Sequence, residues 1–141
     1  MKLNKKLLAE LFSIFSLPLL ILLIHTPLDF YDIYQLIWWI DIPMHFFAGL
    51  LIGRSYFLLI KLLQREGHIG NMHGFANFVF VVSIVAFTAV AWESHEYTAD
   101  LIDSAMRQPS LADTMKDLIL GILGGAAGYA IQFFILENKN K

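Results

Sequence analysis

The chain alternates between long apolar runs and short polar segments. Four apolar runs lie at about residues 7–24, 43–63, 75–92 and 116–136, and each is bounded by charged or turn-forming residues. A helix needs about 20 apolar residues to cross the hydrocarbon core of a bilayer, which is about 30 Å thick. The pattern therefore predicts an all-α fold: a four-helix transmembrane bundle that forms a single integral membrane domain over residues 1–141.

The first run begins like a signal peptide, with lysines before an apolar stretch. The apolar part continues to Ile24, and His25-Thr26-Pro27 lacks the small residues of a cleavage site, so we expect a retained anchor. Pro18 lies inside this predicted span. A kink there is tolerable if a neighbouring helix satisfies the carbonyl that the proline leaves without a donor.

An aromatic segment separates the first two runs. Residues 30–40 are rich in Tyr and Trp, and the segment is too short and too acidic for a fifth span. Because Trp and Tyr concentrate at the boundary between lipid and water, we expect an interfacial segment with Trp38 and Trp39 at headgroup depth.

Composition supports a lipid environment. The chain is 57% hydrophobic and 16% charged, with a mean hydropathy of +0.62, whereas soluble domains are about 45–50% apolar and about 25% charged. The lipid bilayer is therefore an expected partner. The net charge of -2 gives no basic surface for nucleic acid. The absence of cysteine excludes disulfides, thiolate catalysis and cysteine zinc sites.

The positions of the cations predict the orientation. Positive residues are retained on the cytoplasmic side of a membrane. They gather at both chain ends and in the connection between the second and third runs, as Lys2, Lys5, Lys6, Lys61, Arg65, Lys139 and Lys141. Between the third and fourth runs, Arg107 and Lys116 are outnumbered by acidic residues. Both termini are therefore predicted to be cytoplasmic.

This orientation brings ionisable residues from three helix ends to one side of the membrane. They are Asp41 and His45 at the start of the second run, Glu93 and Glu96 at the end of the third, and Asp113 and Asp117 at the start of the fourth. Like charges at low dielectric cannot all ionise unpaired, so such carboxylates must take up protons or bind a cation.

Asp, Glu and His side chains together suit a divalent ion such as Zn²⁺, Mn²⁺, Fe²⁺ or Mg²⁺. The predicted metal ligands are Asp41, His45, Glu93, Asp113 and Asp117. The predicted catalytic acid–base residues are His45, Glu93 and Glu96. The identity of the ion is left open.

Some of these residues also have purely structural explanations. Asp41 precedes Pro43 and would serve as a helix N-cap, and Ser110 with Asp113 has the spacing of a capping box. His45 would otherwise be a satisfied interfacial histidine.

Three further residues near the third run are not assigned to the site. Asp100 and Asp103 are predicted to form a solvated acidic face if the helix extends beyond the bilayer. His95 is predicted to point away from Glu93 and Glu96.

Two runs combine these polar residues with glycines at helical spacing. Residues four apart lie on one helix face. The series are Asp41, His45, Gly49 and Gly53 in the second run, and Asp113, Asp117, Gly121 and Gly125 in the fourth, with Gly124 and Gly128 alongside. Small residues permit close helix approach in lipid. We expect the two helices to pack against each other or against a shared neighbour, and the same faces would suit a homo-oligomer.

The spaced motifs resemble those of known bacterial membrane families. They are Asp41-x-x-x-His45-Phe46 with Gly49, Trp92-Glu93-x-x-Glu96, and Asp113-Thr114-x-x-Asp117 before Gly121 and Gly124. The pattern, over about residues 38–128, resembles the YjdF-like inner-membrane proteins and, more distantly, the VanZ-like family. The resemblance implies a multi-pass protein of the plasma (inner) membrane whose polar residues form one site. The VanZ-like family is linked to teicoplanin resistance, but its last motif resembles Asp-x-x-x-Asn, so we do not transfer that function.

Three functions fit this pattern. The first is an enzyme site in which a divalent ion or acid–base pair acts on a lipid-like or envelope substrate. The second is an ion- or proton-binding transport component. The third is a non-catalytic protein that binds a membrane partner or a lipid. A serine hydrolase is disfavoured because the chain has no Gly-x-Ser-x-Gly motif.

Overall fold

The computed structural model describes residues 5–103 and 105–139, and its regular structure there is entirely helical. Two of the cations used to predict orientation, Lys2 and Lys141, lie outside these residues. The long helices are α1 (Lys5–Phe30), α3 (Asp41–Arg65), α4 (Gly74–Asp103) and α5 (Leu111–Lys139). The predicted all-α fold is confirmed, and each long helix is long and apolar enough to cross a membrane.

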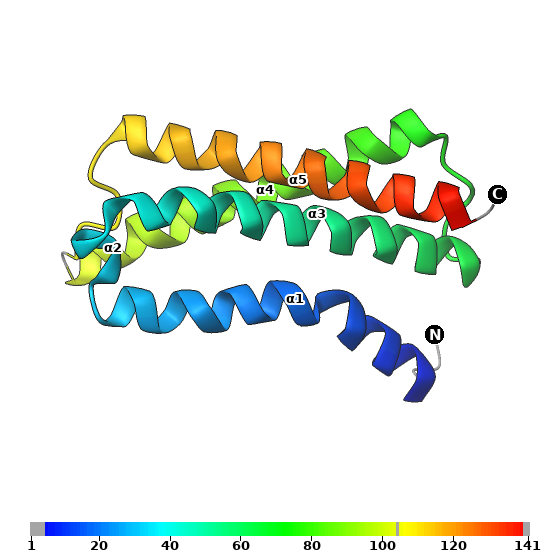
Figure 1. The fold of residues 1–141 in the computed structure, drawn as a ribbon, viewed down its shortest axis with the longest axis horizontal. Coiled ribbons are helices and arrows are strands. Elements are labelled where there is room, and N and C mark those ends of the chain that lie inside the picture. The colour runs from blue at the N-terminus through cyan, green and yellow to red at the C-terminus, as the bar shows by residue number, and fades with distance from the viewer. Residues whose placement is uncertain (1–4, 104, 140–141) are drawn as a thin grey trace.

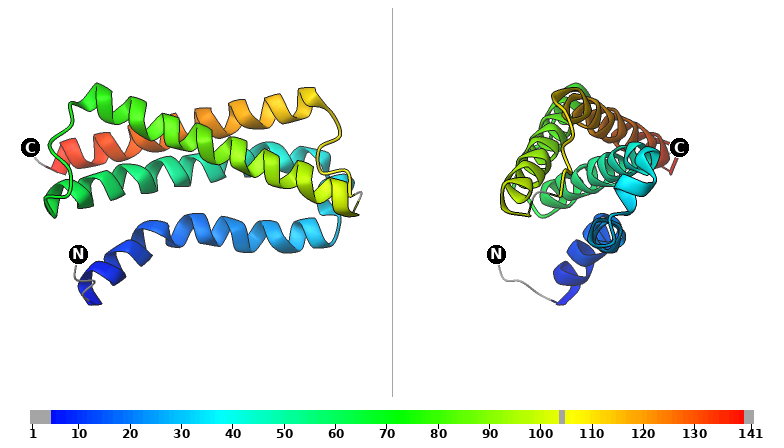
Figure 2. Two further views of the ribbon diagram at one scale, coloured as in Figure 1. Left: turned by 180° about the vertical axis from the view of Figure 1, so that it is seen from behind. Right: turned by 90° about the vertical axis from the view of Figure 1, so that its left-hand side faces the viewer.

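The long helices lie side by side along one axis, as Figure 1 shows. At one end, which we call the α2 end, α3 and α5 begin and α4 finishes. Both chain termini lie at the opposite, terminal end (Figure 1). Figure 2 shows α3, α4 and α5 as the three sides of a triangle, with α1 outside it against α3. Which end faces the cytoplasm stays a prediction.

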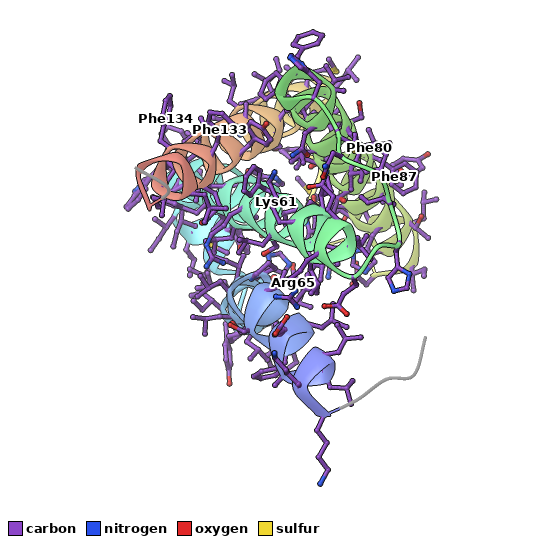
Figure 3. All side chains as sticks on the ribbon, turned by 90° about the vertical axis from the view of Figure 1, so that its right-hand side faces the viewer. Lys61, Arg65, Phe80, Phe87, Phe133 and Phe134 are labelled. Atoms are coloured by element: carbon purple, nitrogen blue, oxygen red, sulfur yellow. The ribbon has the colours of Figure 1, made fainter. Side chains whose placement is uncertain are left out.

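The surface of the bundle is apolar. Phe80 and Phe87 on α4 and Phe134 on α5 are exposed and point away from the bundle, as Figure 3 shows from the terminal end. Extensive exposed apolar surface marks a membrane or protein interface. The core behind it contains Phe57, Val81 and other residues of the three-helix triangle.

The helices extend beyond the apolar runs that predict them. The third run ends near residue 92, whereas α4 continues to Asp103. Likewise α5 begins at Leu111, ahead of the run that starts near residue 116. Hydropathy falls at the first charged residues, but backbone hydrogen bonding continues, because polar side chains of the extensions find partners at the α2 end.

Two short elements join α1 to α3. They are α2 (Ile33–Leu36) and the 3₁₀ turn η1 (Trp38–Ile40). Trp38 and Trp39 are both exposed. The aromatic segment is therefore a short connection and not a fifth long helix, as its sequence predicts.

Pro18 lies inside α1 and removes one backbone donor. The carbonyl that loses its partner is that of Ile14, four residues earlier. Ser55 of α3, which is fully buried, donates its hydroxyl to this carbonyl at 2.6 Å. A neighbouring helix thus supplies the missing donor, and Figure 1 shows that α1 bends in its N-terminal half.

Glycines let α3 and α5 pack backbone to backbone. A Cβ built on Gly49 would lie 2.9 Å from the Gly121 Cα, and one on Gly53 would lie 2.8 Å from the Gly125 Cα. Such separations leave no space for a side chain. The expected packing of these helices along their glycine faces is therefore observed within one chain. A homo-oligomer through the same faces stays a prediction, and here those faces are filled internally.

Candidate functional site

His45 lies at the centre of the polar residues at the α2 end. Its Nε2 is 3.1 Å from Asp41 Oδ1, one helical turn earlier on α3. Its Nδ1 is 3.8 Å from Glu93 Oε1 on α4. Both ring nitrogens therefore face carboxylates, one from its own helix and one from a neighbour.

Two groups of three side chains offer ligand atoms within 4.8 Å of one another. One group is Asp41, His45 and Asp117, and the other is His45, Glu93 and Glu96. We call these five residues the acidic cluster. The structure thus brings together residues from α3, α4 and α5 that are far apart in the sequence, because all three helices have the relevant end at the same side of the bundle. Their roles as ligands or catalysts stay predictions.

Three of the four carboxylates of the cluster are buried, and Asp41 is partly exposed. Asp117 is 4% exposed, Glu93 is 6% and Glu96 is 8%. Trp92 Nε1 donates to Glu96 Oε1 at 2.8 Å, and Gln108 Nε2 donates to Glu93 Oε2 at 2.8 Å. Asp117 Oδ1, by contrast, is buried without a hydrogen-bond partner. A buried carboxylate oxygen without a hydrogen bond is costly, and the Lys116 ammonium, 3.3 Å away, offsets part of this cost.

Asp41 does not cap α3, so that structural explanation is wrong. The helix follows η1 directly, and the residue at the N-cap position is Ile40, without a side-chain capping bond. Asp41 is therefore inside the first turn, with its carboxylate toward His45. Ser110 does cap α5, since its Oγ accepts from the Asp113 backbone N–H at 3.1 Å.

Lys116 enters the cluster, which the sequence analysis did not anticipate. Its ammonium pairs with Asp113 and lies 3.3 Å from Asp117 Oδ1 and 3.6 Å from Asp41 Oδ2. Asp113 is bound to Lys116 and belongs to neither ligand group. The signal for Lys116 was its i, i+3 spacing from Asp113, which places both on one helix face.

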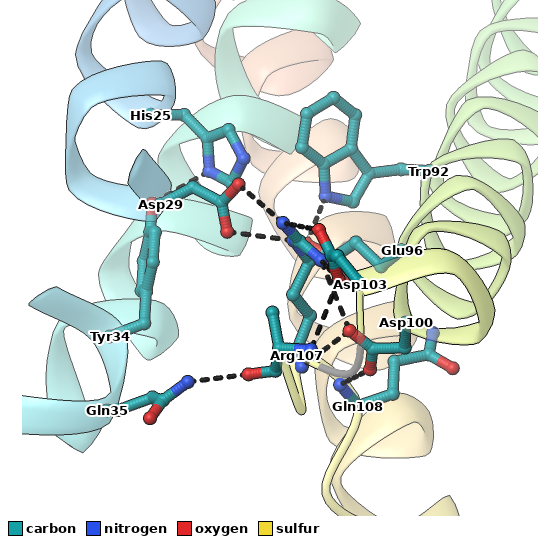
Figure 4. A network of polar contacts seen from close by, with 11 residues as sticks. His25, Asp29, Tyr34, Gln35, Trp92, Glu96, Asp100, Asp103, Arg107 and Gln108 are labelled. Carbon is teal, nitrogen blue, oxygen red and sulfur yellow. Dashed lines mark hydrogen bonds and ion pairs between the residues drawn. The ribbon is translucent and has the colours of Figure 1, made fainter. Parts of the chain in front are cut away.

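Arg107 ties α1 to the end of α4, as Figure 4 shows. Its guanidinium donates to Asp29, Asp100 and Asp103. The hydrogen bonds with Asp103 and Asp29 raise the pKa of the Arg107 guanidinium further above its usual range. Asp100 and Asp103 are therefore anchors for Arg107, and the predicted solvated acidic face is wrong for Asp100, which is largely buried.

A histidine of α1 also reaches the site. His25 Nδ1 is 2.8 Å from the Tyr34 hydroxyl, and its ring lies edge-on to Trp92 with centroids 4.8 Å apart (Figure 4). Burial raises the pKa of the Tyr34 hydroxyl. His95 is exposed on α4, its ring is tilted by 37° to that of Trp92 with centroids 5.5 Å apart, and it belongs to neither ligand group.

A comparison with protein families shows the family to which the chain belongs. The model of a family described as "Predicted membrane protein (DUF2238)" matches residues 6–138. The chain belongs to this family. The YjdF-like proteins are in it, so that resemblance is confirmed, whereas the VanZ-like resemblance is not supported. No curated protein and no solved structure gives a significant match.

This DUF2238 protein contains two cavities that meet beside His25, Tyr34 and Asp41. The first has a volume of about 460 Å³ and is lined mainly by apolar side chains of α1, α3 and α4. The second has a volume of about 320 Å³ and is lined mainly by polar residues of the α2 end, among them Arg107 and Lys116. The acidic cluster therefore borders both an apolar and a polar space.

Proposed function

We propose that the acidic cluster binds a divalent metal ion and performs acid–base chemistry on a lipid-like or envelope substrate at the outer surface of the plasma membrane. The observation that carries this proposal is the position of His45. The His45 side chain belongs to both groups of potential ligands, one with Asp41 and Asp117 and the other with Glu93 and Glu96.

The donor set suits a hard or borderline divalent ion. Carboxylate oxygens and an imidazole nitrogen are the ligands that Zn²⁺, Mn²⁺ and Fe²⁺ accept. Asp117 Oδ1 has no hydrogen bond and lies 3.3 Å from the Lys116 ammonium, a cation that a divalent ion would displace. A bound divalent ion would supply Lewis-acid chemistry by polarising a phosphoryl or acyl oxygen of the substrate.

The chain's own residues would hold the ligands and move the proton. Asp41 orients the His45 imidazole through the 3.1 Å contact. Glu96 is held by Trp92 and Glu93 by Gln108, so both carboxylates have fixed positions. Either Glu96 or His45 would act as general base, because Glu96 lines the polar cavity and His45 lines the apolar cavity that adjoins it.

A second candidate is a non-catalytic locking role, and Lys116 favours it. This ammonium already offsets the charge of Asp113 and lies near Asp41 and Asp117. The cluster would then only stabilise the helix ends. The transport hypothesis gains no comparable support, since in the part of the chain that the structure describes, the space next to the cluster inside the bundle is lined mainly by apolar side chains.

The deciding experiment is elemental analysis of detergent-purified protein. We expect about one equivalent of a divalent metal in the wild type and a loss of most of it in Glu93→Gln and His45→Ala. Glu66→Gln is the matched control, because Glu66 lies at the terminal end beside Arg65. Metal-free wild type after purification without chelators and reconstitution with Zn²⁺, Mn²⁺ or Fe²⁺ would favour the locking role.

A further inference from the structure

The larger cavity has the size of a ligand site and extends away from the acidic cluster into the bundle. Its volume of about 460 Å³ lies within the range of about 300–1,000 Å³ that is typical of small-molecule sites. Along α1 its wall extends from Phe15 to His25, which is about 15 Å at 1.5 Å per residue. Asp41 and His45 line its end at the cluster.

The walls of this cavity suit hydrocarbon and not water. A buried water needs two to four polar partners. Thr88 and Trp92 supply polar atoms along the α4 wall, but the Thr88 hydroxyl donates to Ile84 O and the Trp92 N–H donates to Glu96. The remaining wall away from the cluster includes Phe15, Ile52 and other apolar side chains. A flexible apolar chain is the filling that matches these surfaces.

The polar cavity continues the apolar one at the cluster. The two share His25, Tyr34 and Asp41, so a single molecule can occupy both. The polar cavity is lined by acidic side chains and by Arg107 and Lys116. These charged groups can bind the polar head of a lipid. An apolar cavity that joins a polar cavity at the helix ends matches the shape of a single amphiphilic molecule.

We propose that the two cavities bind one acyl-chain lipid, with its hydrocarbon chain between α1, α3 and α4 and its polar head beside Asp41 and His45. That the lipid head lies at a reactive centre rests on the proposed function. The binding site for the hydrocarbon chain rests on the cavity geometry alone. This assignment narrows the substrate class to lipids that present a reactive head at the end of a single long chain.

The test uses palmitic acid with a photoreactive diazirine at mid-chain, with the wild-type protein in phosphatidylcholine vesicles. After illumination, mass spectrometry of peptides locates the label. We expect labelling of the cavity wall near Phe15, Ile52 and Val85 that a tenfold excess of unlabelled palmitate competes away. Labelling that is spread over lipid-facing residues such as Phe87 and is not competed would overturn the proposal.

A pair of matched substitutions locates the chain. Ala48 lines the cavity on α3, so Ala48→Trp fills it and is expected to reduce cavity labelling at least fivefold. Ala91 is exposed on α4 outside the cavity lining, so Ala91→Trp is expected to leave labelling unchanged. Equal labelling of both folded variants would overturn the proposal. If Ala48→Trp fails to fold, the competition experiment on the wild type still decides.

Metal content measured in the same samples separates this inference from the proposed function. Competed labelling of metal-free wild type would support the chain site and count against the metal site. Stoichiometric metal without competed labelling would support the metal site and count against the binding site for the hydrocarbon chain.

Discussion

Ser55 on α3 donates its hydroxyl, at 2.6 Å, to the Ile14 carbonyl that Pro18 leaves open on α1. Ser55→Ala is expected to lower the free energy of unfolding by about 1–3 kcal/mol, because it leaves a buried carbonyl unpaired. Reversible unfolding in mixed micelles measures this difference. In a Pro18→Ala background the cost should be smaller, since the backbone N–H restored at position 18 can donate to Ile14. Equal costs in the two backgrounds would contradict this account.

The close contact between α3 and α5 predicts that adding one methyl group at the interface lowers the stability of the bundle. Gly53→Ala is expected to destabilise the bundle by about 1–3 kcal/mol, the usual cost of overpacking, because the added Cβ meets the backbone of Gly125. Gly70→Ala is the control, since nothing lies within 4 Å of a Cβ built on Gly70. Unfolding midpoints of the two variants compare them, and similar midpoints would refute the close approach.

Arg107 predicts a measurable tie between α1 and α4. Arg107→Gln is expected to cost about 1–2 kcal/mol of unfolding free energy, the range for hydrogen bonds to charged groups after a reduction for partial exposure. Arg65→Gln at the terminal end should have a smaller effect, because its ion pairs are exposed.

The same tie has a predicted pH dependence. The pKa of Arg107 is raised in the folded protein, so its stabilising contribution is present below the ordinary arginine pKa of about 12.5 and is lost only above it. The stability difference between wild type and Arg107→Gln should therefore persist between about pH 7 and pH 10. A difference that disappears over this interval would show that another group is responsible.

Lys116 separates the two candidate roles of the cluster. If a metal binds, Lys116→Gln should strengthen binding by about tenfold or more, because unit charges about 4 Å apart interact by about 4 kcal/mol at an effective dielectric constant of 20. Titration with Zn²⁺ or Mn²⁺ measures the affinity, and Lys61→Gln, on α3 near the terminal end, is the control (Figure 3). Loss of stability without any metal binding would favour the locking role.

The predicted orientation is testable because the chain has no cysteine of its own. In intact cells, a membrane-impermeant maleimide should label Leu111→Cys, at the exposed start of α5, from outside. It should not label Asn71→Cys, in the connection between α3 and α4, until the cells are opened. The opposite result would reverse the topology and place the acidic cluster on the cytoplasmic side.

Hydropathy and helical spacing predict the main architecture. The four runs give the four long helices, and the glycines spaced four apart give the contact between α3 and α5. The antiparallel order then requires that the ends carrying His45, Glu93 and Asp117 meet. These features follow from period and topology alone, so one sequence is enough to predict them.

Contacts made by long side chains and by loops are not predictable in this way. From the sequence, Lys116 is one of two cations between the third and fourth apolar runs, yet its ammonium lies near three carboxylates. Arg107 follows the end of α4, and only the path of the connection to α5 brings it to Asp29 on α1. Ser55 pairs with Ile14 through the relative rotation of two helices, which a hydropathy pattern does not specify.

The packing of α1 determines the route by which a ligand would reach the larger cavity. The larger cavity is lined by α1, α3 and α4, and α1 packs chiefly against α3, so a ligand is expected to enter between α1 and α4. A molecule dissolved in the bilayer would enter sideways, by two-dimensional diffusion, without passing through water. Occupancy would then follow its mole fraction among the membrane lipids, and dilution into excess detergent would empty the protein.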